Sequence, residues 1–121
     1  MLATGEVTGD RKVGVLAGRN NNSGLITNSY ATGTIAGNEM IGGLVGFNES
    51  NSSITNSNAE CSVSGTNHIG GLVGANTSAT VSSSHATGDV TGTGSNLGGL
   101  VGNNDGMYIP ISLPLYIAPF L

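Results

Sequence analysis

The sequence has two histidines and one cysteine, residue types that can serve as a proton carrier, a nucleophile or a soft metal ligand. His68 and His85 occupy unrelated positions of the internal repeat described below, so they form no row. A single cysteine, Cys61, can form neither an internal disulfide nor a cysteine-based metal site. We therefore expect both histidines to be surface turn residues, and we predict no catalytic residue and no metal site.

A pair of carboxylates could act on a glycosidic bond. Glu49 and Asp105 share one position of the repeat, two copies apart, which places them roughly 10 Å apart if each copy adds about 4.8 Å. The carboxylates of inverting glycosidases lie about 6.5–9.5 Å apart, and those of retaining enzymes about 5–5.5 Å. Without an aromatic platform or a nearby arginine, a solvated turn charge is the favoured interpretation.

Charge and glycine pattern argue against nucleotide ligands. The chain has three basic residues, seven acidic residues and a net charge of −4, whereas nucleic-acid binding needs clustered lysine and arginine. Glycine is abundant, with 21 residues, but no G-x-G-x-x-G or Walker lysine precedes a helix pattern, and no calcium-binding nonapeptide occurs. We predict no cofactor and no nucleic-acid partner.

Composition limits the remaining classes. A chain of 121 residues holds at most one domain. Charged residues make up 8% of it, yet it contains no run of about 20 apolar residues that could span a membrane. The start, "MLATGEVTGD", lacks the basic and apolar regions of a signal peptide. We expect either a cytosolic protein or a piece of a longer chain.

An internal repeat organises most of the sequence. Nearly the same eight residues recur every 28 positions, as "VGVLAGRN" (13–20), "IGGLVGFN" (41–48), "IGGLVGAN" (69–76) and "LGGLVGNN" (97–104). The second half of each copy also repeats, and the third copy loses one residue after Asn76 and regains one before Leu97. We assign residues 1–106 to the repeat region, with coils that start near 13, 41, 69 and 97.

Each copy contains three short segments rich in Ile and Val, separated by Gly, Asn, Ser and Thr, which is typical of strands. No segment has the 3.6-residue period of a helix. We predict an all-β fold, a parallel β-solenoid (β-helix) with three strands per 28-residue coil and about three full coils plus part-coils. A single coil cannot bury its own apolar face, so the coils must stack.

Stacking brings equivalent residues about 4.8 Å apart. It predicts a structural ladder made of an apolar column, Leu16, Leu44, Leu72 and Leu100, and a row of hydrogen-bonded side chains, Asn20, Asn48, Asn76 and Asn104. A ligand-binding role for the asparagine row is the less favoured alternative. Strand alternation leaves open whether Leu44 or Val45 faces inward, and a bulge would allow both.

The last fifteen residues, "MYIPISLPLYIAPFL" (107–121), share nothing with the repeat. They hold all three prolines and no charge, and they are too short and too broken by proline for a membrane helix. This apolar tail is a cap over the last coil, a partner-binding segment, or a non-native terminus from a truncated or shifted reading frame. The third interpretation is favoured.

The period, the "GGLVG" core and the phrase "NSYATG" (28–33) resemble the GLUG repeat family over about residues 3–106. The resemblance implies large bacterial secreted or surface proteins, among them adhesin-like proteins and some immunoglobulin-A-cleaving metallopeptidases. It implies an extracellular or cell-surface location and a stalk or adhesive role. Catalysis is not implied, because those metallopeptidases carry zinc motifs outside the repeats and this chain has no H-E-x-x-H.

We therefore predict a non-enzymatic structural or adhesive repeat module, a fragment of a bacterial surface or secreted protein. Its expected partner is a host or matrix surface, either protein or glycan, and unpaired strand edges predict end-to-end self-association. The alternative is an accessory carbohydrate-binding or carbohydrate-cleaving β-helix. That alternative needs a groove with clustered acids and aromatics, and Tyr30 and Phe47 are the only aromatics before the tail.

Overall fold

The computed structural model describes residues 1–105, with the backbone alone for Asp105, and this part is built from strands and turns without a helix. The tail predicted for residues 107–121 lies outside the described residues. The strands form four parallel sheets. Sheet A contains β1 (Leu2–Thr8), β5 (Tyr30–Ala36), β9 (Asn58–Gly65), β13 (His85–Thr87) and β14 (Val90–Gly92).

The other three sheets are narrower. Sheet B contains β2 (Arg11–Val13), β6 (Glu39–Gly42), β10 (Asn67–Gly70) and β15 (Leu97–Gly98). Sheet C contains β3 (Ala17–Asn20), β7 (Val45–Glu49), β11 (Val73–Thr77) and β16 (Val101–Asp105). Sheet D contains β4 (Leu25–Thr27), β8 (Ser53–Thr55) and β12 (Thr80–Ser82).

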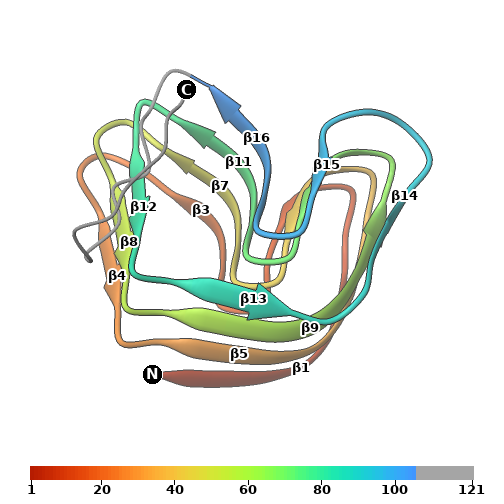
Figure 1. The fold of residues 1–121 in the computed structure, drawn as a ribbon, viewed down its shortest axis with the longest axis horizontal. Helices are drawn as coiled ribbons and strands as arrows, with labels where there is room; N and C mark the ends of the chain where they lie inside the picture. Colours follow the sequence, from red (N-terminus) through yellow and green to blue (C-terminus); the bar gives the residue numbers. More distant parts are fainter. Residues whose placement is uncertain (106–121) are drawn as a thin grey trace.

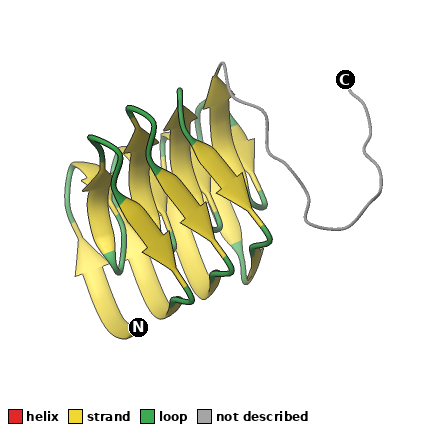
Figure 2. Ribbon diagram, turned by 90° about the vertical axis from the view of Figure 1, so that its left-hand side faces the viewer, coloured by secondary structure: helices red, strands yellow, loops and turns green. Residues whose placement is uncertain are grey.

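Successive coils stack directly on one another, so each strand pairs with the equivalent strand of the next coil (Figure 1). Seen from the side, the described part is a stack of about four coils (Figure 2). Ile41 pairs with Ile69, and Val45 with Val73, both 28 residues apart. The predicted all-β parallel solenoid and its period are confirmed.

The third copy keeps its place in the stack despite its two length changes. Val81 pairs with Ile54, 27 residues away, whereas Leu97 pairs with Ile69, again 28 residues away. The lost residue falls between β11 and β12, and the regained one between β14 and β15. Both changes lie in connections, where the backbone tolerates them.

Each complete coil has four sheet directions where the sequence predicted three strands. The "IGGLVG" segment, expected as one strand, is divided by a bend at Gly43–Leu44 into β6 and β7. The bend is held between coils, because the carbonyl oxygen of Leu44 accepts hydrogen bonds from the N–H groups of Leu16 (3.1 Å) and Ala17 (3.2 Å). The bend also explains how Leu44 and Val45 can both face inward. They lie on either side of the corner, and both are fully buried.

The glycines of this segment are required by close backbone approaches. A Cβ on Gly43 would lie 2.2 Å from the carbonyl oxygen of Gly71 and 3.0 Å from the Cβ of Ala59 in sheet A. A Cβ on Gly46 would lie 2.4 Å from the backbone nitrogen of Val13. Contacts this short exclude any side chain. Glycine therefore lets the bend reach sheet A and lets sheets B and C touch.

The core consists of vertical columns of like residues. One column joins Val7, Ile35, Val63 and Val90, and another joins Ile26, Ile54 and Val81. Ile35, Val63, Ile54 and Val81 are almost completely buried, whereas Val7, Ile26 and Val90 are only partly buried. The described part of the chain offers no helix long and apolar enough to span a bilayer.

Candidate functional site

The structure brings Asn20, Asn48, Asn76 and Asn104 together in a single row between sheets C and D. Each Nδ2 donates to the Oδ1 of the next residue, over 2.9, 2.8 and 2.9 Å. Asn48 and Asn76 are fully buried. Their remaining donors bond to backbone carbonyls, 3.2 Å from Asn48 to Thr80 and 2.9 Å from Asn76 to Ala79. The row therefore faces the protein's own backbone and holds the turn after sheet C in place.

A second polar row, buried at Ser29 and Ser57 and half-buried at Ser84, was not predicted from the sequence. Ser29, Ser57 and Ser84 follow sheet D at equivalent positions. The N–H of Ser29 donates to Ser57 Oγ (3.2 Å), and the N–H of Ser57 donates to Ser84 Oγ (3.1 Å). Each hydroxyl also donates to the carbonyl oxygen two residues earlier, for example Ser57 to Thr55 over 2.9 Å. The recurrence of serine every 27 or 28 residues was the signal that could have identified this row.

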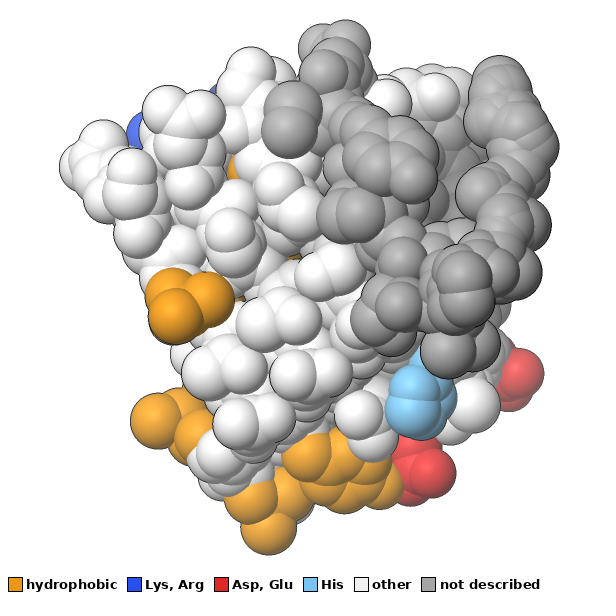
Figure 3. All heavy atoms as spheres, turned by 60° about the vertical axis from the view of Figure 1, so that its left-hand side comes forward, with side chains coloured by type: hydrophobic (Ala, Val, Ile, Leu, Met, Phe, Trp, Pro, Cys, Tyr) orange, Lys and Arg blue, Asp and Glu red, His pale blue; other side chains and the backbone are white. Residues whose placement is uncertain are grey.

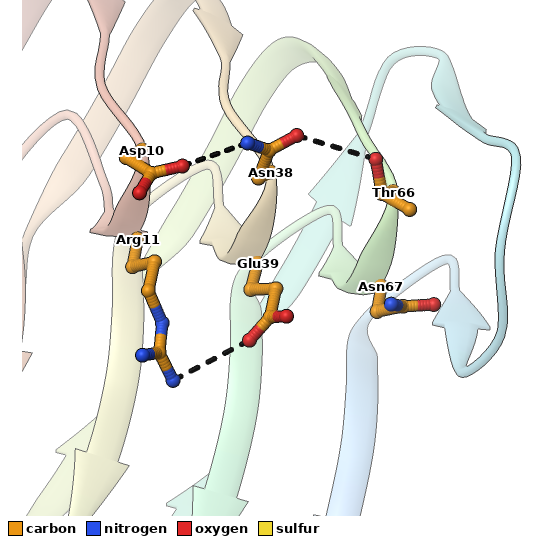
Figure 4. A pocket seen from close by; sticks show the side chains of 6 residues that line it. All are labelled: Asp10, Arg11, Asn38, Glu39, Thr66 and Asn67. Atoms are coloured by element: carbon orange, nitrogen blue, oxygen red, sulfur yellow. Dashed lines mark hydrogen bonds and ion pairs between the residues drawn. The ribbon is translucent and has the colours of Figure 1, made fainter.

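A polar groove runs across three coils outside sheet B, with a volume of about 260 Å³ (Figure 4). Asn38 is at its centre, donating to Asp10 Oδ1 over 2.7 Å and accepting from the Thr66 hydroxyl over 3.4 Å. Beside it, Arg11 and Glu39 form an exposed ion pair at 3.4 Å. The groove offers hydroxyl, amide and charged groups, but none of its lining residues is aromatic.

One member of the carboxylate pair, Glu49, is held in an ion pair. Arg19 in β3 binds the Glu49 carboxylate through both Nε and Nη2. The expectation that no arginine lies near was wrong, because Arg19 reaches diagonally across one coil. The backbone of Asp105 is two coils from Glu49 in sheet C. The Asp105 side chain lies outside the description, so the separation of the two carboxylates stays a prediction.

The histidines lie apart, as their repeat positions implied. His85 is exposed at the start of β13, and His68 is in β10 with a positive φ of 58°. The equivalent residues Lys12, Met40 and Asn96 share this left-handed conformation, with φ of 57°, 59° and 62°. This position thus requires a backbone bend and accepts unrelated side chains. Nδ1 of His68 lies 3.1 Å from Nδ2 of Asn96.

Among residues 1–105, Tyr30 and Cys61 have shifted pKa values. A hydrogen bond from the Tyr30 hydroxyl to Glu60 raises the pKa of this tyrosine, and partial desolvation and the Glu60 charge act in the same direction. Burial raises the pKa of the Cys61 thiol, and the charge of Glu60 adds to the effect. Both shifts favour the protonated, unreactive form. Within residues 1–105, no three His, Cys, Asp or Glu side chains are arranged to hold a metal ion.

Where Figure 3 shows described residues, most of the surface is backbone or side chains that are neither charged nor apolar, and apolar side chains gather towards its lower left. Four large apolar side chains are exposed among the described residues, and all four belong to the first or last coil: Met1, Leu2, Leu25 and Leu97. The sides of the stack are therefore polar, whereas its ends are apolar.

The family model described as the GLUG motif matches the chain three times, over residues 9–36, 37–67 and 65–91. These matches together cover more than half of the chain. They follow the 28-residue coils of the stack. No curated protein matches the chain. No solved structure matches it either.

Proposed function

Because the chain belongs to the GLUG-motif family and forms a β-solenoid repeat module, we propose that it is a non-enzymatic structural or adhesive element of a bacterial surface or secreted protein. It acts outside the cytoplasm as a piece of a longer chain. The stack holds its polar sides at fixed spacing and presents them to a protein or glycan of a host or matrix surface.

The observation that carries this proposal is that the polar groups inside the stack serve the stack itself. No buried side-chain nitrogen or oxygen among residues 1–105 lacks a hydrogen-bond partner. The asparagine and serine rows bond to neighbouring coils and to backbone carbonyls. An active site keeps polar groups available for its substrate, whereas a scaffold satisfies them internally. The arrangement therefore supports display over catalysis.

The outward-facing side chains of sheet A supply a broad presentation surface. Residues that alternate with the buried columns point away from the core. Thr34 in β5 is exposed, while its neighbour Ile35 is fully buried. Short hydroxyl side chains on a stiff sheet lose little side-chain entropy when they bind, so many weak contacts can add up.

A binding screen tests the proposal. We expect the purified chain to be retained on at least one immobilised extracellular-matrix protein or glycan, with no release of sugar or peptide fragments. Thr34→Lys alters the face of sheet A, and Thr27→Lys makes the matched change at an exposed position of sheet D. Retention that weakens with one variant and persists with the other identifies the face. A chain that is retained on no surface, or that cleaves the polymer, contradicts the proposal.

The polar groove outside sheet B favours one alternative, an accessory carbohydrate-binding module. Its amide and hydroxyl groups, from Asn38 and Thr66, lie side by side on successive coils (Figure 4). Titration calorimetry with soluble oligosaccharides, using Asn38→Ala and the distant Asn58→Ala as a control, separates this alternative from protein binding. Heat that disappears with Asn38→Ala alone favours the groove.

A further inference from the structure

The N-terminal end of the stack leaves the apolar columns of the core uncovered. Leu16, Ala17 and Ile26 begin columns whose next members, Leu44, Val45 and Ile54, are fully buried. The first members are only partly buried and border an open hollow of about 420 Å³. A further coil would cover this hollow, because a neighbouring coil covers the same columns elsewhere in the stack.

The opposite end presents the complementary edge. A second hollow, of about 350 Å³, lies there between sheet A and sheet B and is bordered by Val90, Leu97 and Gly99. Leu97 is 43% exposed, whereas its column neighbour Ile69 is fully buried. Strands β14, β15 and β16 each have a described partner on one side only. Parallel edges of this kind pair with any strand of matching direction and register.

We propose that the N-terminal end of one copy of this chain binds the C-terminal edge of a second copy, so that the solenoid continues head to tail across the junction. In this arrangement β1, β2 and β3 of one copy extend sheets A, B and C of the other. Leu100 then lies next to Leu16, and Val90 next to Val7, as like residues do inside the stack. The C-terminal edge is the expected partner surface because it would make the same contacts that neighbouring coils make within one chain.

The direction of the asparagine row selects head-to-tail over head-to-head contact. The Nδ2 groups of Asn20, Asn48 and Asn76 all donate towards the C-terminal end, so the outermost oxygen at the N-terminal end is Oδ1 of Asn20. Asn20 donates to Asn48, Gly24 and Ser53, and among residues 1–105 nothing donates to its Oδ1. Two N-terminal ends in contact would bring two carbonyl oxygens together. An N-terminal end that meets a C-terminal edge avoids this repulsion.

The exposed apolar residues point to the same contact. Met1, Leu2 and Leu25 are 77%, 65% and 66% exposed and surround the N-terminal end. Monomeric proteins seldom leave apolar side chains clustered in this way, and such clusters mark protein contacts. The sides of the stack have no comparable cluster among the described residues.

Analytical ultracentrifugation of the full chain over a wide concentration range tests the proposal. Head-to-tail contacts do not close on themselves, so we expect the average mass to rise with concentration beyond that of a dimer. Leu16→Lys places a charge at the N-terminal end, where a long side chain can still reach water in the free chain. We expect this variant to weaken association at least about tenfold.

Two further variants keep the outcome interpretable. Thr77→Lys adds the same charge in the middle of the stack, on β11, and is expected to leave association unchanged. If circular dichroism shows that Leu16→Lys is unfolded, Leu25→Lys takes its place, because Leu25 is already mostly exposed. A chain that stays monomeric at high concentration, a discrete dimer that grows no further, or equal weakening by Thr77→Lys overturns the proposal.

Discussion

Gly5 and Gly33 hold equivalent positions in adjacent strands of sheet A and have nearly the same φ, 142° and 136°. They differ in their surroundings. A Cβ on Gly33 would lie 1.8 Å from the carbonyl oxygen of Gly5, whereas a Cβ on Gly5 would meet nothing within 4 Å. The pair separates two costs that usually occur together, backbone strain and steric overlap.

We predict that Gly5→Ala lowers the free energy of unfolding by about 1–3 kcal/mol, because an alanine is strained at this φ. Gly33→Ala adds the overlap with Gly5 and should cost about 1–3 kcal/mol more. Urea unfolding of both variants measures the difference. Equal losses would show that the sheet relaxes enough to accept the extra carbon, which would contradict the tight stacking described here.

Cys61 occupies the same column as Gly33 and Gly88, and its side chain is buried. Because burial raises the pKa of the folded thiol above its ordinary value of 9.0, the unfolded chain releases this proton first as the pH rises. Ionisation of the thiol therefore stabilises the unfolded state relative to the folded state. The free energy of unfolding falls from about pH 9 upward until the pKa of the folded chain is passed.

We predict that Cys61→Ala flattens this alkaline loss of stability, measured as the urea midpoint against pH. Tyr30→Phe is the companion variant, because the hydrogen bond to Glu60 raises the pKa of Tyr30 in the same direction. The thiol of the folded chain should also react slowly with a disulfide reagent and become reactive in urea. Rapid reaction in the native state would show that Cys61 is accessible.

At the scale of elements, the asparagine row fixes the turns between sheets C and D. Asn48 is fully buried and bonds to Asn20, Asn76 and the backbone of Thr80. We predict that Asn48→Ala costs at least about 2–4 kcal/mol, because several partners lose their hydrogen bonds where water cannot replace them. Asn58→Ala, on the outer side of β9, should change stability by less than about 0.5 kcal/mol.

Denaturant unfolding with a constant m-value checks this comparison. If Asn48→Ala were as mild as Asn58→Ala, the row would contribute little and the turns would be held by their backbone alone. That backbone is already suited to tight turns. Asn22, Ser23, Ser50 and Asn51 all have positive φ, and Gly24 N–H bonds to the carbonyl of Asn21 over 3.1 Å.

The elements that the sequence predicted well are those whose residues recur unchanged from one repeat to the next. Ile41 and Ile69 could be paired in advance, because matched side chains at constant spacing imply one register. The bend at Gly43–Leu44 could not be predicted, because an unbroken apolar run is typical of a strand. Only the contact of Gly43 with sheet A requires a corner there. The Arg19–Glu49 pair was also missed, because a diagonal contact leaves no periodic signal.

At the scale of the whole molecule, each coil interacts only with the coils directly next to it. Every coil in the middle contacts one coil above and one below, and strand pairing never skips a coil in the described part. In such a structure the stability is approximately a sum over coils and the interfaces between them. The end coils, each with one neighbouring coil among residues 1–105, should open first. Amide exchange is therefore expected to be slowest in β6–β11 and fastest in β1–β4 and β15.

The leucine column gives the sharpest test of this order. Leu44 and Leu72 lie on adjacent coils and are fully buried, whereas Leu44 and Leu100 are two coils apart. We predict that Leu44→Val and Leu72→Val interact by about 0.5–3 kcal/mol in a double-mutant cycle, because each changes the other's packing. Leu44→Val and Leu100→Val should be additive within about 0.5 kcal/mol, since roughly 10 Å and an intervening leucine separate them. Urea unfolding of the single and double variants supplies both energies. Coupling of similar size in the two cycles would mean that packing changes pass through whole coils, and the molecule would then be one cooperative core instead of a series of coils.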